Sequence, residues 1–208
     1  MQILHPFAGS VQQYEQQLDD IDLHRPRHCP QCQTQRPLTA HGFYTRTLTC
    51  LNFDGSLRVR RYLCLACRRT VSLLPEFALP YLRSSITVIA LVLTARLLEN
   101  KLWQAVTATL LFAMTYQRGQ FWVRRFRRQA ESLCVALAAL TKPAPAPDFV
   151  ERALLMLAAT RWIPAHRFLF AHLRNHLLGW PRSLAPAVFA PQSPPLRCPA
   201  ERPHTTLV

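Results

Sequence analysis

Two pairs of cysteines constrain the fold of this chain more than any other feature of its sequence. Cys29-Pro-Gln-Cys32 and Cys64-Leu-Ala-Cys67 each separate two thiols by two residues, and a strand-rich stretch lies between the pairs. Structural zinc is typically bound by four such thiolates in a tetrahedron, two from each tight turn. We therefore predict that Cys29, Cys32, Cys64 and Cys67 bind one structural Zn²⁺ ion in a zinc ribbon.

The cysteine pattern admits other interpretations. His28 or His41 would replace a cysteine ligand if the register differed, or the two pairs would simply fill a small core. A thioredoxin-like redox site is disfavoured because no βαβ pattern surrounds either pair. Four thiolates leave the metal no open position for water, so the zinc should be structural and not catalytic. The remaining cysteines, Cys50, Cys134 and Cys198, are expected to fill the core or to have no role.

The predicted fold class is α+β, with a small antiparallel zinc ribbon followed by a mostly α-helical region. Residues 45–51 and 57–63 are rich in strand-forming side chains, and Asn-Phe-Asp-Gly-Ser at 52–56 is a turn signal between them. Ser84 and Ser85 offer an N-cap for a helix that should run to about residue 99. That helix is apolar nearly all round, so we expect it to be central.

Further helices fit residues 103–112 and 115–140, and a last helical pair, 149–163 and 165–178, is joined at Pro164. The predicted segments are an acidic, Gln-rich leader (1–27), the zinc ribbon (28–80), a helix-turn-helix-like unit (81–141), a Pro/Ala linker (142–147), the helical pair (148–180) and a Pro-rich disordered tail (181–208).

The charge of the chain points to a polyanionic partner. Lys and Arg total 25 against 11 acidic residues, a formal net charge of +14. Residues 24–142 contain 18 of these basic side chains, of which only Lys101 and Lys142 are lysines. Arginine suits phosphate and guanine contacts, although a GC-rich genome produces the same preference without any function. Double-stranded DNA is the partner that we expect.

The helix predicted for residues 115–140 is amphipathic. At about 100° per residue, an apolar stripe from Trp122 to Leu140 lies opposite a face rich in arginine. In a helix-turn-helix unit, the start of this helix would face bases and its later arginines would contact phosphates. An ordinary solvated face, with Phe121 packed against a neighbouring helix, is the alternative. The predicted DNA-binding residues are Gln117, Arg118, Phe121, Arg124, Arg125, Arg127 and Arg128.

Four segments carry a resemblance to a known family. They are His28-Cys-Pro-Gln-Cys32, His41-Gly-Phe-Tyr-Thr-Arg46, Arg60-Arg-Tyr-Leu-Cys-Leu-Ala-Cys-Arg-Arg-Thr70 and Leu73-Leu-Pro-Glu-Phe-Ala-Leu-Pro-Tyr81. Their order resembles a bacterial family of transposase-like zinc-ribbon proteins with a following helix-turn-helix, many of them of unassigned function. The resemblance covers about residues 28–130 and implies a zinc ribbon fused to a DNA-binding helical unit. A glycine often follows the second cysteine of each pair in that family, whereas Gln33 and Arg68 stand there in this chain.

Other functional classes are disfavoured. The acidic residues outside the leader are scattered, so the carboxylate cluster of a nuclease-type transposase is not expected, nor is any other enzyme activity or small-molecule substrate. His166, His172 and His176 form at most a weak second metal motif. The apolar stretch at 86–98 is too short to span a membrane, and no secretory signal is recognisable, so a cytoplasmic location is expected.

Two other functions and one assembly state stay open at this stage. A zinc-stabilised protein interaction module would dock on another protein with its ribbon and apolar helices. An RNA-binding zinc ribbon would stack bases on Phe43, Tyr44 and Tyr62. A homo-oligomer is also compatible with the sequence.

Overall fold

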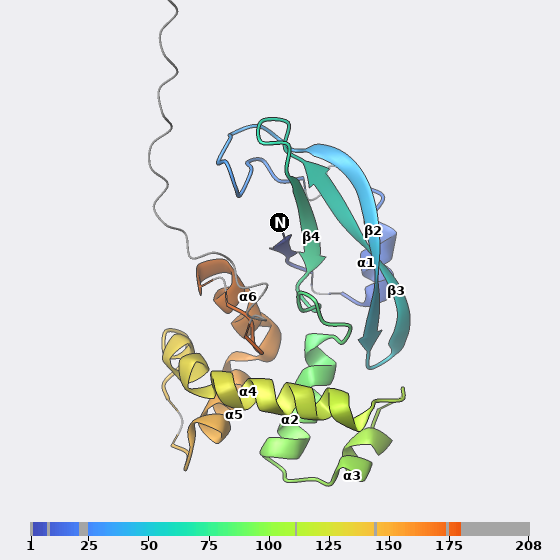
Figure 1. Ribbon diagram of the computed structural model, residues 1–208. Coiled ribbons are helices and arrows are strands. Elements are labelled where there is room, and N and C mark those ends of the chain that lie inside the picture. Colours follow the sequence, from blue (N-terminus) through green and yellow to red (C-terminus); the bar gives the residue numbers. More distant parts are fainter. Residues whose placement is uncertain are drawn as a thin grey trace, which may run out of the picture.

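A four-stranded sheet is joined to a layer of helices in the computed structural model (Figure 1). The structure describes residues 2–7, 9–20, 25–110, 112–143, 145–173 and 175–179. The predicted disordered tail and Cys198 lie outside these residues. The elements in chain order are β1 (Gln2–His5), α1 (Val11–Gln17), β2 (Thr39–Cys50), β3 (Phe53–Leu63), β4 (Thr70–Pro75), α2 (Ile86–Leu97), α3 (Trp103–Ala108), α4 (Tyr116–Leu137), α5 (Phe149–Thr160) and α6 (Trp162–Leu173). The predicted α+β class is confirmed.

The centre of the sheet is the long antiparallel hairpin of β2 and β3. Cys50 pairs with Phe53, so the turn consists of Leu51 and Asn52 alone. The turn predicted at residues 52–56 is therefore wrong in position. Asp54 and Gly55 lie inside β3, where the Asp54 carboxylate accepts a hydrogen bond of 2.9 Å from the hydroxyl of Thr49 across the hairpin.

The leader is part of the sheet and not a separate segment. β1 pairs in parallel with β4, Gln2 opposite Ser72, so the sheet is mixed, in the order β1-β4-β3-β2, and not purely antiparallel as predicted. β3 pairs with β4 at only three positions, which leaves the rest of its edge open. α1 covers that edge: Glu15 accepts the backbone N–H of Arg58, and Tyr14 is buried.

The helical layer is built around α2. The side chain of Ser85 caps the helix by accepting the N–H of Val88 at 3.3 Å, which confirms the predicted start. Six of the residues from Ile86 to Ala95, all apolar, belong to the largest core cluster, with α4, α5 and α6 around them. In Figure 1, α4 lies across the front of α2 and α5.

Several predicted helix ends differ from the structure. α3 ends at Ala108, four residues early, and α4 ends at Leu137. The last two helices are separated at Arg161, where φ is 63°, and not at Pro164. Pro164 lies in the first turn of α6, where its missing N–H would have had no partner in the helix. None of the helices in the described part of the chain is both long and apolar enough for a membrane crossing.

Candidate metal centre and basic surface

The structure brings the four predicted cysteines together. One ligand atom from each lies within 4.8 Å of all the others, with sulfur separations of 3.8 Å between Cys29 and Cys67 and 3.6 Å between Cys32 and Cys64. Ligand sulfurs in a tetrahedral zinc site with Zn–S bonds of about 2.3 Å lie about 3.8 Å apart. All described cysteines are free thiols. The donor set and its spacing therefore fit a tetrahedral thiolate metal site.

The two cysteine turns have the same backbone construction. The N–H of Cys29 donates to the carbonyl of Thr34, and the N–H of Cys64 donates to the carbonyl of Arg69, each five residues on. Gln33 and Arg68 both adopt positive φ, 57° and 55°, directly after the second cysteine. Glycine adopts this conformation at little cost, but these two residues also reach it. The missing glycines therefore do not prevent the cysteine turns from forming.

The thiols differ in their protonation chemistry. The backbone N–H of Cys67 donates to the Cys64 sulfur and lowers the pKa of Cys64 to about 7. Burial raises the pKa of Cys67 to about 11. Four thiolates so close together repel one another, and a divalent cation that replaces their protons removes this repulsion. His28 and His41 are exposed and do not belong to the cluster.

The cysteine cluster lies far from the arginine-rich helix. Cys64 directly follows β3 at the open end of the hairpin, whereas the turn end joins α2 through hydrogen bonds from Thr49 to Arg83 and from Ser85 to Thr49. β2 has 12 residues, which corresponds to a length of roughly 36 Å. Figure 1 shows the cysteine turns and α4 at opposite ends of the molecule. The length of the hairpin therefore separates the cysteine cluster from this helix.

One stripe of α4 faces away from the core. Gln117, Phe121, Arg124 and Arg128 recur at helical spacing and are exposed, and so is Arg127 beside them. Arg124, Arg127 and Arg128 form no ion pair with any described residue. The opposite stripe is buried as predicted, except for Leu140, which follows the helix and is 42% exposed.

Two of the predicted DNA-contact residues, Arg118 and Arg125, are not fully exposed on this stripe. Arg118 is half-buried. Arg125 donates from Nε to the carbonyl of Leu178 at 2.7 Å and from its terminal nitrogen to the carbonyl of Gly179. Its guanidinium also lies 5.4 Å from the centroid of the Phe121 ring. Arg125 therefore ties α4 to the segment after α6 and is not free on the arginine face.

The connection before α4 differs from a helix-turn-helix. Residues 109–115 separate α3 from α4, more than the three or four residues of that motif. Instead, α3 is held against the start of α4 by aromatic packing. Trp103 and Tyr116 lie edge to face at 5.5 Å, and a Cβ added to Gly119 would be 2.3 Å from the Trp103 ring. Gly119 was not among the residues predicted to have a role, although glycine inside a helix is a signal of close packing.

Two of the three aromatic residues predicted to stack RNA bases, Phe43 and Tyr62, are covered by other side chains, whereas Tyr44 is half-buried. Tyr62 is 1% exposed. The ring of Phe43 is covered by the guanidinium groups of Arg58 and Arg60, at 5.0 and 4.6 Å. The surface therefore offers Tyr44, but neither Phe43 nor Tyr62, for stacking an RNA base.

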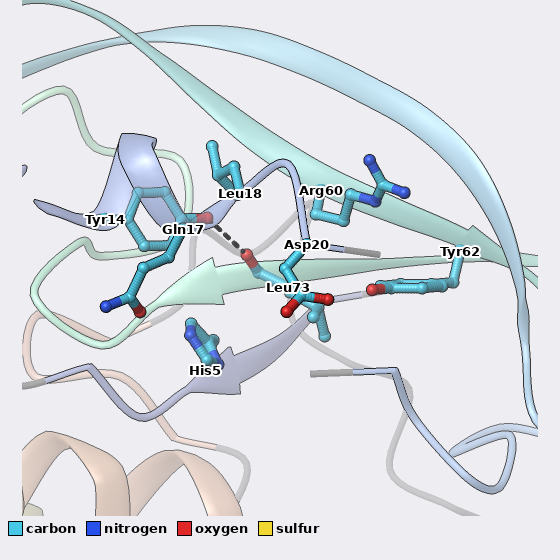
Figure 2. A pocket seen from close by; sticks show the side chains of 8 residues that line it. All are labelled: His5, Tyr14, Gln17, Leu18, Asp20, Arg60, Tyr62 and Leu73. Atoms are coloured by element: carbon cyan, nitrogen blue, oxygen red, sulfur yellow. Dashed lines mark hydrogen bonds between the residues drawn. The ribbon is translucent and has the colours of Figure 1, made fainter. Parts of the chain in front are cut away.

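A small pocket lies between α1 and the sheet (Figure 2). The hydroxyl of Tyr14 donates to the carbonyl of Leu73 at 3.4 Å, and Leu18 and Tyr62 line the same space. Its volume of about 20 Å³ has room for a single water molecule. The pocket is therefore a gap between packed elements and not a ligand site.

The three C-terminal histidines do not form a second metal site. His172 is exposed, whereas the rings of His166 and His176 are buried 6.1 Å apart. His176 accepts the N–H of Leu178 at Nδ1 and so donates from Nε2 to the carbonyl of Pro80. Within the described part of the chain, the four cysteines are the one group of His, Cys, Asp or Glu that could hold a metal ion.

The comparison with known proteins gives one match. Residues 29–111 match the model of a family described as a domain of unknown function (DUF6431). The matched span begins at the first clustered cysteine and ends after α3, so it leaves out α4. No curated protein and no solved structure matches the chain.

Proposed function

We propose that the chain is a DNA-binding protein in which four cysteines hold one structural Zn²⁺ ion and α4 contacts duplex DNA. The observation that carries the proposal is the exposed stripe of α4, whose three free arginines have no acidic partner among the described residues. Uncompensated guanidinium groups at helical spacing suit the regularly spaced phosphates of a duplex.

Zinc is the metal that the donor set favours. Four thiolates at tetrahedral spacing exclude the oxygen-preferring ions Mg²⁺ and Ca²⁺ and fill the coordination sphere. When bound, the ion would supply rigidity and no Lewis-acid chemistry. The proposal includes no enzyme activity and places the protein in the cytoplasm, where thiols stay reduced.

The residues of α4 would have distinct roles. Gln117 and Phe121 lie toward its N-terminal end, where an amide can bond base edges and an aromatic ring can contact a thymine methyl. Arg124, Arg127 and Arg128 would contact phosphates, while Arg125 would hold the helix in position. A role in a mobile element, or in regulation derived from one, follows from the transposase-like resemblance and is part of the proposal.

The test is binding to a labelled 30-base-pair duplex across a salt series. Replacing Arg124, Arg127 and Arg128 with alanine should reduce the slope of log affinity against log salt by about three units, because each lost phosphate contact contributes about 0.9. The matched control replaces Arg27, Arg36 and Lys142, which are also exposed and carry the same total charge. Equal losses in the two triple variants, or binding that is insensitive to salt, would sink the proposal and favour a protein interaction module.

A further inference from the structure

The outer edge of β2 is open over part of its length. Cys50 and Phe53 flank a two-residue turn, so Cys50 and every second residue before it bond to β3, while Thr49, Thr47 and Thr45 point outward. Thr49 confirms this direction, since its N–H donates to the carbonyl of Arg83 and its carbonyl accepts the N–H of Ser85. The outward groups of Thr45 and Thr47 have no hydrogen-bond partner among the described residues.

Among the described residues, only 83–85 lie along the outer edge of β2, and the segment before them runs away from it. Residues 83–85 lie along Thr49, but Tyr81 has φ of 60°, which turns the preceding segment away. The guanidinium of Arg46 donates to the carbonyls of Leu79 and Leu82 and keeps that segment in place. A groove of about 460 Å³ remains, bordered by residues 44–47 on one side and 81–83 on the other.

The groove has the chemistry of a peptide site. The ring of Tyr81 is 57% exposed at its rim, and Arg83 is exposed beside it. None of the described residues that line the groove is Asp or Glu, and Arg46 adds a second cation. Neither proline nor lysine occurs in residues 39–50, although such residues commonly protect an exposed edge strand from pairing.

We propose that this edge binds an extended acidic peptide segment of another protein, which adds a strand beside Thr45 and Thr47. A peptide offers both N–H donors and C=O acceptors to the open edge, whereas a phosphodiester backbone offers acceptors only and would leave the strand carbonyls without partners. The net charge of +14 disfavours a second copy of this chain as the occupant. The inference is independent of the proposed DNA contact on α4.

The probe is a labelled ten-residue peptide of alternating glutamate and valine, added to the full chain. Amide hydrogen exchange at Thr45 and Thr47 should slow when the peptide binds, while exchange at exposed Gly42 stays unchanged. A ten-nucleotide oligothymidylate serves as the second probe. Unchanged exchange at both threonines, or protection by the oligonucleotide equal to that by the peptide, overturns the proposal.

Two variants test the same edge. Thr47→Pro removes an outward N–H without touching the hairpin ladder and should weaken peptide binding about tenfold, whereas Thr47→Val, which keeps the N–H, should not. Arg83→Glu should also weaken binding about tenfold by reversing the charge at the rim, and Lys142→Glu, at another exposed position, is its control. If Arg83→Glu and Lys142→Glu bind the peptide equally, the proposal fails even where Thr47→Pro does not fold.

Discussion

Gln33 and Arg68 adopt the same left-handed backbone conformation, each one residue after the second cysteine of its turn. For a residue with a Cβ this conformation costs about 1–2 kcal/mol. We expect Arg68→Gly to raise the free energy of unfolding of the metal-loaded protein by about 0.5–1 kcal/mol, because glycine relieves the strain but is more flexible when unfolded. Urea denaturation measures the change. Arg69→Gly, at the next position with no positive φ, should bring no gain, and equal gains would contradict the explanation.

Metal binding should depend on each member of the cysteine cluster. Cys29→Ser or Cys64→Ser removes one thiolate of four and should reduce metal content from about one zinc per chain to nearly none. Elemental analysis after dialysis against a weak chelator gives the content. Cys50→Ser is the matched control, because Cys50 lies in β2 outside the cluster. Full metal content in the Cys64 variant would show that the cluster is not the binding site.

Arg125 should contribute to stability, in contrast to its neighbour Arg124. The Arg125 side chain donates to two carbonyls beyond α6, whereas Arg124 is exposed. Arg125→Ala should lower the free energy of unfolding by about 1–3 kcal/mol, since hydrogen bonds from charged groups are lost, and Arg124→Ala should change it by less than about 0.5 kcal/mol. Chemical denaturation of both variants makes the comparison. Equal stabilities would show that the contact does not stabilise the fold.

The buried histidines should make the fold sensitive to acid. Burial lowers the pKa of His166 to about 3 and that of His176 to about 4, both below the ordinary value of 6.5. Between pH 6.5 and 3, these two histidines are therefore protonated in the unfolded chain but stay neutral in the folded chain. The stability that the two neutral histidines allow above pH 6.5 is lost as the pH falls toward 3. Each such proton contributes about 1.4 kcal/mol per pH unit.

Substitution of these two histidines should have opposite effects at neutral pH. Neither ring nitrogen of His166 has a hydrogen-bond partner among the described residues, so His166→Phe should stabilise the protein by about 1 kcal/mol and flatten its pH profile. His176→Phe loses the bonds to Pro80 and Leu178 and should destabilise it. Thermal unfolding between pH 4 and 7 tests both. A His166→Phe profile as steep as that of the unmodified chain would be the contrary result.

The sequence predicted the features that depend on local chemistry. The spacing of the cysteines identified the cluster, and Ser85 identified the start of α2, because ligand spacing and helix capping each need only a few neighbouring residues. The apolar stripe of α4 followed from its periodicity in the same way. These are the parts of the structure in which residues close in sequence determine the outcome.

Features that depend on distant partners could not be predicted. Gln2–His5 is too short for a strand pattern and becomes β1 only through its pairing with β4. Arg125 has the helical position of a surface arginine, and nothing nearby indicates that the carbonyl of Leu178 lies beside it. The open edge of β2 was likewise invisible, because it depends on where residues 79–83 run.

The parallel pairing of β1 with β4 also affects the order of folding. Gln2 meets Ser72 across 70 residues of chain, which makes it one of the slowest contacts to form by diffusion. A metal ion that links Cys32 to Cys64 would bypass the hairpin between them. The chain that must close between Gln2 and Ser72 would then be about half as long. Each halving lowers the entropic cost of loop closure by about 0.6 kcal/mol. We therefore expect refolding to be faster with zinc than without it, with the first strand joining after the hairpin has closed.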